Sequence, residues 1–130
     1  MMETALRAAL IDWLASDPAL TDHLNIVAEE AIVRATPPWL ALVASASTDW
    51  STKTQAGREL RVALELHTRG NDPAGDGPLV DAIERRIEAL PRAQSGFAIA
   101  SIAFLRARAE RRADNARGTL LEYRMRCLST

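Results

Sequence analysis

The sequence has few of the residues that build disulfides and membrane anchors. Cys127 is its only cysteine, which excludes an intramolecular disulfide and gives no sign of an oxidising compartment. No apolar run approaches the roughly 20 residues that a membrane-spanning helix needs. Glu3 and Arg7 precede the first amphipathic pattern without a basic cluster, so we expect no signal peptide. These absences favour a cytoplasmic protein without a membrane anchor.

Motifs for catalysis and for cofactors are missing as well. The sequence contains no phosphate-binding GK[ST] loop, no GxGxxG after a strand and no GxSxG elbow. His23, His67 and Cys127 fall into no metal-ligand spacing. The loop with Asp72 and Asp76 matches a calcium loop only in part, because an isoleucine occupies the position of the bidentate glutamate. We therefore expect no catalytic, cofactor-binding or metal-binding residue, and the sequence favours a protein that is not an enzyme.

Length and charge indicate a single domain whose two ends differ in net charge. The 130 residues, 48% apolar and 25% charged, suit one soluble domain spanning 1–130. The net charge of −1 divides unevenly: residues 1–57 hold seven acids and three bases (−4), residues 58–91 seven and five (−2), and residues 92–130 three and eight (+5). Such a gradient predicts two surfaces that face different neighbours.

Hydrophobic periodicity predicts a mixed order of helices and strands. Residues 25–38 remain ambiguous between a short strand and a turn, which ends at Pro37 and Pro38. The other expected elements are a helix over 3–15, a helical turn after Asp17, strands over 39–47 and 60–66, a helix over 78–90, and strands over 96–112 and 119–128. This order predicts an α+β fold, with a mostly antiparallel sheet of about four strands and helices packed on one face.

Strict alternation marks the buried faces of two of these strands. The apolar side chains expected in the core are Leu60, Val62, Leu64 and Leu66, and Leu121, Tyr123, Met125 and Cys127. In the strand over 96–112 the pattern changes phase to Leu105, Ala107 and Ala109, and a bulge near 101–104 would explain the change. Residues 70–78 are dense in turn formers, so we expect an exposed, mobile loop there.

A group of arginines on the last two strands allows two interpretations. Its members are Arg106, Arg108, Arg111, Arg112, Arg124 and Arg126. They form either a basic stripe for nucleic acid or an acidic partner, or a solvated face with Glu110 and Glu122 as cross-strand partners. Interleaved exposed aromatics, which single-strand binders use for stacking, are missing. The solvated or partner-facing interpretation is therefore favoured.

The stretch "TDWSTKTQAGRELRVALELHTRG" joins a polar loop to an alternating strand. The loop contains Trp50 and the only lysine of the chain, Lys53, in a segment without periodicity. A tryptophan in such a loop either packs on its own domain or meets a partner. Together with extended strand edges, this loop favours an interaction module over an enzyme.

Three segments carry a resemblance to a known family. They are "LRAALIDWLASDPALTDHL", "TPPWLALVASASTDWSTKTQAGRELRVALELHTRG" and "SIAFLRARAERRADNARGTLLEYRMRCL", and the most specific part runs from Asp49 to Leu66. Together they resemble the tail-completion proteins, or tail terminators, of long-tailed non-contractile phages, prophages and gene transfer agents. The similarity to the lambda-type terminator covers nearly the whole chain.

The resemblance implies a structural role without catalysis. Six subunits would form a ring on the tail tube protein, stop tube polymerisation and offer a surface to the head–tail stopper, or neck protein. DNA would pass through the lumen without specific binding. The protein would assemble in the host bacterial cytoplasm and end in the neck of the particle. The loop residues Asp49, Trp50, Lys53, Thr54 and Arg58 are then expected to contact a neighbouring subunit or the tube ring.

Three alternatives remain at this point. One is another head–tail connector, an adaptor or stopper between portal and tail. The second is a small ligand-binding domain whose pocket uses His67 or Cys127. The third is a nucleic-acid-binding module on the hairpin from Arg106 to Arg126, for which binding would depend steeply on salt.

Overall fold

The computed structural model describes residues 1–30, 35–70 and 72–130. The elements in chain order are α1 (Met2–Ala15), α2 (Pro18–Thr21), β1 (Ile26–Ala28), β2 (Trp39–Asp49), β3 (Gly57–Arg69), η1 (Pro73–Asp76), α3 (Gly77–Glu88), β4 (Phe97–Arg111), η2 (Ala113–Asn115) and β5 (Ala116–Ser129). In the part of the chain that the structure describes, none of these helices has the length and hydropathy to cross a bilayer.

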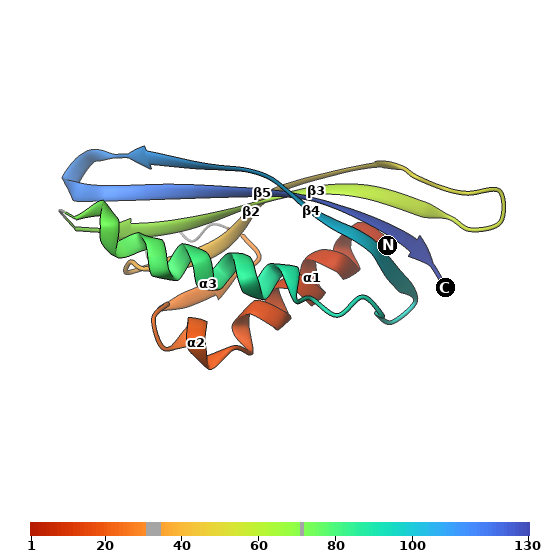
Figure 1. Ribbon diagram of the computed structural model, residues 1–130, viewed down its shortest axis with the longest axis horizontal. Coiled ribbons are helices and arrows are strands. Elements are labelled where there is room, and N and C mark those ends of the chain that lie inside the picture. Colours follow the sequence, from red (N-terminus) through yellow and green to blue (C-terminus); the bar gives the residue numbers. More distant parts are fainter. Residues whose placement is uncertain (31–34, 71) are drawn as a thin grey trace.

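The five strands form one sheet in the order β1-β2-β3-β5-β4. β1 pairs with β2 in parallel, and all other neighbours pair antiparallel. The helices lie on one face of this sheet and leave the other face uncovered (Figure 1). The expected α+β class is confirmed, with five strands where about four were expected. The additional strand is β1, so the short strand considered for residues 25–38 is present, although residues 31–34 lie outside the described part.

The helices form where their capping residues and apolar stripes predict them. Asp17 accepts a hydrogen bond from the backbone N–H of Ala19 at 3.0 Å, so it caps α2 as expected. α1 and α3 are fastened to each other by the Trp13 indole, whose Nε1 donates to the Arg86 carbonyl at 2.7 Å. The guanidinium of Arg86 lies 3.3 Å from the centroid of the same ring. This contact orients the two helices under the sheet.

The core lies between the helices and the inner faces of β3 and β5. All eight alternating side chains that the sequence assigned to the core on these strands are buried. Cys127 belongs to this set, and its burial raises the pKa of the thiol to about 11. The thiol is therefore protonated at neutral pH and packs as a small apolar group.

β4 departs from regular pairing at two positions. The register with β5 shifts between Ile99 and Ser101 and again between Phe104 and Arg106. The bulge expected near 101–104 is thus present as two bulges, one on each side of that range. Of the alternation expected at Leu105, Ala107 and Ala109, the last two positions are confirmed and Leu105 is wrong, because Leu105 is the inserted residue of the second bulge. Phe104 occupies the helix-facing position opposite Tyr123, and Arg106 and Arg108 keep their place on the uncovered face.

Residues 72–78 contain regular structure that the sequence does not predict. Pro73–Asp76 forms the 3-10 turn η1, capped by Asp72, whose carboxylate accepts from the N–H of Ala74 at 3.0 Å. Asp76 stands at the N-cap position of α3, but its side chain makes no capping bond. Its carboxylate accepts hydrogen bonds from Thr68 of β3 and Arg117 of β5 instead. The charged hydrogen bond from Arg117 is stronger than the bond to a backbone N–H that a cap would make.

Removal of the Tyr123 hydroxyl should not destabilise the protein. The side chain is 0% exposed, and its hydroxyl has no hydrogen-bond partner among the described residues. Burial, with Glu84 and Glu88 nearby, raises the pKa of this phenol. We expect Tyr123→Phe to keep or raise the free energy of unfolding, by up to about 1 kcal/mol, because it deletes an unpaired buried polar group.

Urea denaturation followed by circular dichroism checks this expectation. The matched control is Tyr123→Ala, which removes the ring and should lower the free energy of unfolding by about 3–5 kcal/mol. A clear loss of stability in Tyr123→Phe would show that the hydroxyl has a partner in solution.

Candidate functional site

The β2–β3 hairpin brings together the five residues that the sequence singled out. Asp49 ends β2 and faces Arg58 at the start of β3, and Trp50, Lys53 and Thr54 lie in the loop between them. Figure 1 shows this hairpin, drawn in yellow, projecting beyond the helices at one end of the sheet. The hairpin is therefore accessible to another protein along most of its loop.

Internal hydrogen bonds hold the loop in shape. The Ser51 hydroxyl donates to Asp49 Oδ1 at 2.7 Å and accepts from the N–H of Gly57 at 3.0 Å. Gly57 has no space for a side chain, since a Cβ there would lie 2.4 Å from the Trp50 carbonyl oxygen. The side chain of Lys53 is exposed at the turn and forms no ion pair within the described residues. The loop thus carries an exposed lysine on a backbone that its own hydrogen bonds hold in place.

Trp50 lies partly on its own domain. It is half-buried, and the Arg126 guanidinium of β5 lies 5.5 Å from the centroid of its ring. The sequence analysis left two outcomes open for this residue, packing on its own domain or contact with a partner. The structure shows the first in part and leaves one side of the indole exposed.

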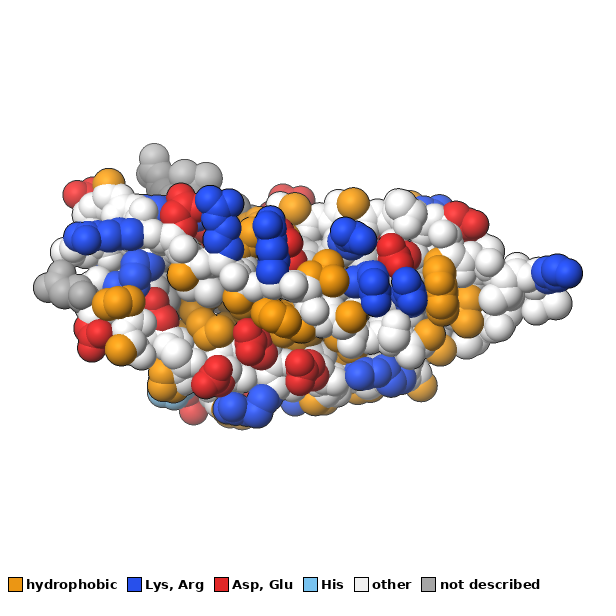
Figure 2. Space-filling view, turned by 45° about the horizontal axis from the view of Figure 1, so that its top comes forward, with side chains coloured by type: hydrophobic (Ala, Val, Ile, Leu, Met, Phe, Trp, Pro, Cys, Tyr) orange, Lys and Arg blue, Asp and Glu red, His pale blue; other side chains and the backbone are white. Residues whose placement is uncertain are grey.

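The arginine group is mostly paired on the uncovered face of the sheet. Arg106 Nε lies 2.7 Å from Glu122 Oε2, which confirms the expected cross-strand partner. Arg126 Nε donates to Glu59 Oε1 at 2.9 Å, and this bond lowers the pKa of the Glu59 carboxyl. Arg112 pairs with Glu65. Figure 2 shows acidic and basic side chains mixed on the visible surface. This mixing favours the solvated interpretation over a continuous basic stripe for nucleic acid.

His67 and Cys127 cannot serve one pocket. His67 lies on the uncovered face, stacked on Trp39 with 4.9 Å between ring centroids, whereas Cys127 is buried on the helix-covered face. Desolvation, and then the charge of Arg112, lower the pKa of His67. Among residues 1–30, 35–70 and 72–130, no group of three His, Cys, Asp or Glu side chains could hold a metal ion.

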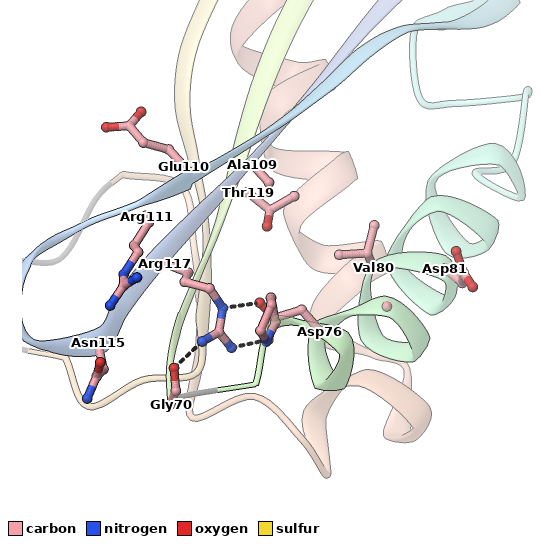
Figure 3. A pocket seen from close by; sticks show the side chains of 12 residues that line it. Gly70, Asp76, Val80, Asp81, Ala109, Glu110, Arg111, Asn115, Arg117 and Thr119 are labelled. Carbon is pink, nitrogen blue, oxygen red and sulfur yellow. Dashed lines mark hydrogen bonds and ion pairs between the residues drawn. The ribbon is translucent and has the colours of Figure 1, made fainter.

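A cleft lies between α3 and the ends of β4 and β5. It encloses about 600 Å³, and Val80, Ala109 and Thr119 lie on its walls. Its charged floor is a clamp between Arg117 and Asp76 (Figure 3), with Nε–Oδ2 at 2.8 Å and Nη2–Oδ1 at 3.0 Å. The guanidinium also donates to the Gly70 carbonyl. Because these two charges neutralise each other, the clamp itself offers no free charge to a ligand.

This clamp was not predicted from the sequence. Its two members are 41 residues apart. The hydroxyl of Thr68 donates to the same carboxylate at 2.9 Å, from a position that strand alternation placed on the inner face. No local pattern predicts such a pair, because it depends on how α3 lies on the sheet.

The clamp should contribute stability that disappears in acid. The Arg117 hydrogen bond, followed by that of Thr68, holds the pKa of Asp76 below its ordinary value. A depressed folded-state pKa stabilises the fold above the unfolded pKa of about 4, and the contribution is lost as pH falls through the folded value. We expect Asp76→Asn to unfold more easily than the wild type at neutral pH, with a difference that shrinks below about pH 4.

Urea midpoints between neutral and acidic pH measure this difference. The control is Asp81→Asn on the same helix, where the carboxylate is exposed and forms no ion pair within the described chain. Equal pH profiles for Asp76→Asn and the wild type would contradict the stabilising role of the clamp.

Comparisons with known proteins identify the family. No curated protein matches the chain. A chain from the "Virion of native gene transfer agent (GTA) particle" has the same fold, with a TM-score of 0.84, 22% identity, and coverage of 98% of this chain and 97% of that one. The family model "Tail completion protein gp17" matches residues 8–127, so the resemblance inferred from the sequence is confirmed and the chain belongs to the tail completion protein gp17 family.

Proposed function

We propose that this protein is a tail terminator, a structural protein that caps the tail tube. In this role, six copies form a ring on the last ring of tube subunits, prevent further polymerisation and offer the opposite surface to the neck. The observation that carries the proposal is the tail-completion family match over residues 8–127. The chain of the gene transfer agent virion with the same fold supports it, because that fold occurs within an assembled particle.

The charges of the domain suit a ring through which DNA passes. Specific DNA binding would slow the passage, and it usually requires a domain-wide basic excess. This chain has a net charge of −1, and the uncovered face of its sheet pairs arginines with glutamates from neighbouring strands. We therefore propose that DNA passes without specific contacts. Binding of the isolated protein to DNA with a steep salt dependence would argue against this part of the role.

The β2–β3 hairpin is the surface that we assign to assembly. It projects from the sheet, its loop is ordered by internal bonds, and Asp49, Lys53, Thr54 and Arg58 are exposed along it. An ordered loop loses little conformational entropy when it binds. In the proposed ring the hairpin contacts a neighbouring subunit or the tube protein, and Trp50 offers the exposed side of its indole.

Electron microscopy of particles from a strain lacking the gene tests the function. We expect tails of uncontrolled length that fail to join heads, and restoration of normal particles when the gene is supplied again. Normal-length tails beside finished heads would instead assign the protein to an adaptor or stopper position in the neck. Intact particles in the deletion strain would overturn an assembly role altogether.

Reversal of the loop charge should impair capping without unfolding the protein. Lys53 is exposed, so we expect Lys53→Glu to keep the melting temperature. In the complemented strain it should reduce head-joined particles roughly tenfold, the equivalent of about 1.4 kcal/mol of binding. Lys53→Arg retains the charge and serves as the control, and Trp50→Ala tests the aromatic contact in the same assay. Wild-type particle yields for both Lys53→Glu and Trp50→Ala would remove the hairpin from the interface.

A further inference from the structure

Both edges of the sheet are only partly covered within the described residues. On one edge, β1 pairs with β2 over Trp39–Ala41 and no further. On the other edge, the chain before β4 covers only its beginning, where the Ile99 N–H donates to the Arg92 carbonyl at 2.8 Å. The remainder of β2, residues 42–49, and of β4, residues 100–111, has no strand partner on the outer side among the described residues. Such free edges pair readily with another strand.

Along the free part of β4, every second residue points its backbone N–H and C=O groups away from β5. Arg112 N–H donates inward to the Ala116 carbonyl at 2.8 Å. Because antiparallel strands alternate between inward and outward backbone groups, Arg111, Ala109 and Ala107 then point N–H and C=O away from β5. The nearest register shift lies before Arg106, so these three positions follow without interruption.

The free part of β2 offers the same arrangement. Trp50 N–H donates inward to the Gly57 carbonyl at 2.9 Å, so the backbone groups of Asp49, Ser47 and Ser45 point away from β3. The register shift of β2 lies earlier, between residues 42 and 44. Each edge therefore has three outward positions two residues apart, with small side chains at Ser45 and Ser47.

The directions of the two edges allow them to meet. Three successive antiparallel pairings separate β2 from β4, so the two strands run in opposite directions within one sheet. A second copy in the same orientation therefore places its β2 antiparallel to β4 of the first. A head-to-tail contact of this kind uses two different surfaces and closes into a ring when the rotation between copies permits.

The two edges are also complementary in charge. β2 carries one charged side chain, Asp49 (−1), whereas β4 carries three arginines and one glutamate (+2). Asp49 on β2 and the residues Arg108 and Arg111 on β4 form no ion pair within the described chain. Opposite potentials on the two edges favour contact between unlike edges and oppose contact between like ones.

The helix-covered side of β4 has an apolar surface beside the same edge. Phe104 is 48% exposed, and Ala107 and Ala109 continue its row toward the end of the strand. A neighbouring subunit at this edge would remove the Phe104 ring from water.

We propose that a second copy of this chain docks on β4 by strand addition, so that residues 45–49 of one subunit pair antiparallel with residues 107–111 of the next. The contact joins the sheets of neighbouring subunits into one continuous sheet. This inference rests on the proposed terminator role for its ring, and it specifies which surfaces of the subunits form that ring.

Cysteine cross-linking in assembled particles tests the contact. Particles from the complemented deletion strain would carry Ser47→Cys together with Ala109→Cys and be treated with a short bismaleimide. We expect a ladder of linked subunits on denaturing gels, up to the full ring. Each single variant should give no species larger than a linked dimer. Ser47→Cys combined with Ala15→Cys, where Ala15 is exposed on α1, should likewise give no ladder. The native Cys127 is buried and should not react.

A second variant separates loss of contact from loss of fold. The N–H of Ala109 points outward, so Ala109→Pro should fold, as circular dichroism can verify, yet fail to complement, whereas Ala109→Val should complement. Intact particles without a ladder, or normal complementation by Ala109→Pro, would overturn the strand pairing and leave the terminator role standing. Intact particles in the uncomplemented deletion strain would instead overturn the terminator role.

Discussion

The pairing of β3 with β5 is the constraint on which the rest of the structure depends. The two strands pair continuously from Gly57 to Arg69, and their inner faces supply the alternating side chains that α1 and α3 cover. The helices lie under this central pair on one side only, so the outer parts of the sheet extend beyond them (Figure 1). The exposed hairpin and the free strand edges are consequences of a wide sheet with a narrow helical layer.

The strand order also shows where the charges of the sequence lie in the sheet. A sequence gradient has no direction in space until the strand order is known, and the order β1-β2-β3-β5-β4 places the weakly acidic β2 and the basic β4 toward opposite edges. From the sequence alone, the gradient predicted two surfaces that face different neighbours. The strand order adds that the unlike charges also lie on the two edges at which neighbouring copies would meet. Edge strands carry charges in many monomers as protection against pairing. Here the opposite signs permit pairing in one arrangement and disfavour the others.

Local patterns predicted the elements whose burial follows a strict period, and little beyond them. The alternation on β3 and β5 assigned the core correctly because a half-buried strand must place every second side chain inward. β1 has three residues, too few for any period to be recognised. The clamp between Asp76 and Arg117 and the stacking of Arg126 on Trp50 join segments that are distant in sequence, so they depend on the final packing. Leu105 was misplaced because a bulge restores alternation after shifting it by one residue.

Some residues of the β2–β3 hairpin are explained by its fold, whereas Lys53 is explained by a role in assembly. Gly57 and Ser51 are explained by the loop itself, since one has no space for a Cβ and the other bonds both strand ends. Lys53 has no such explanation, because its side chain is exposed and forms no ion pair within the described chain. A loop that is built rigidly and presents a charge without an internal partner is suited to recognition. The most specific part of the family resemblance, Asp49 to Leu66, covers this loop and the strand that anchors it, so the same segment serves both the core and the contact that we propose for assembly.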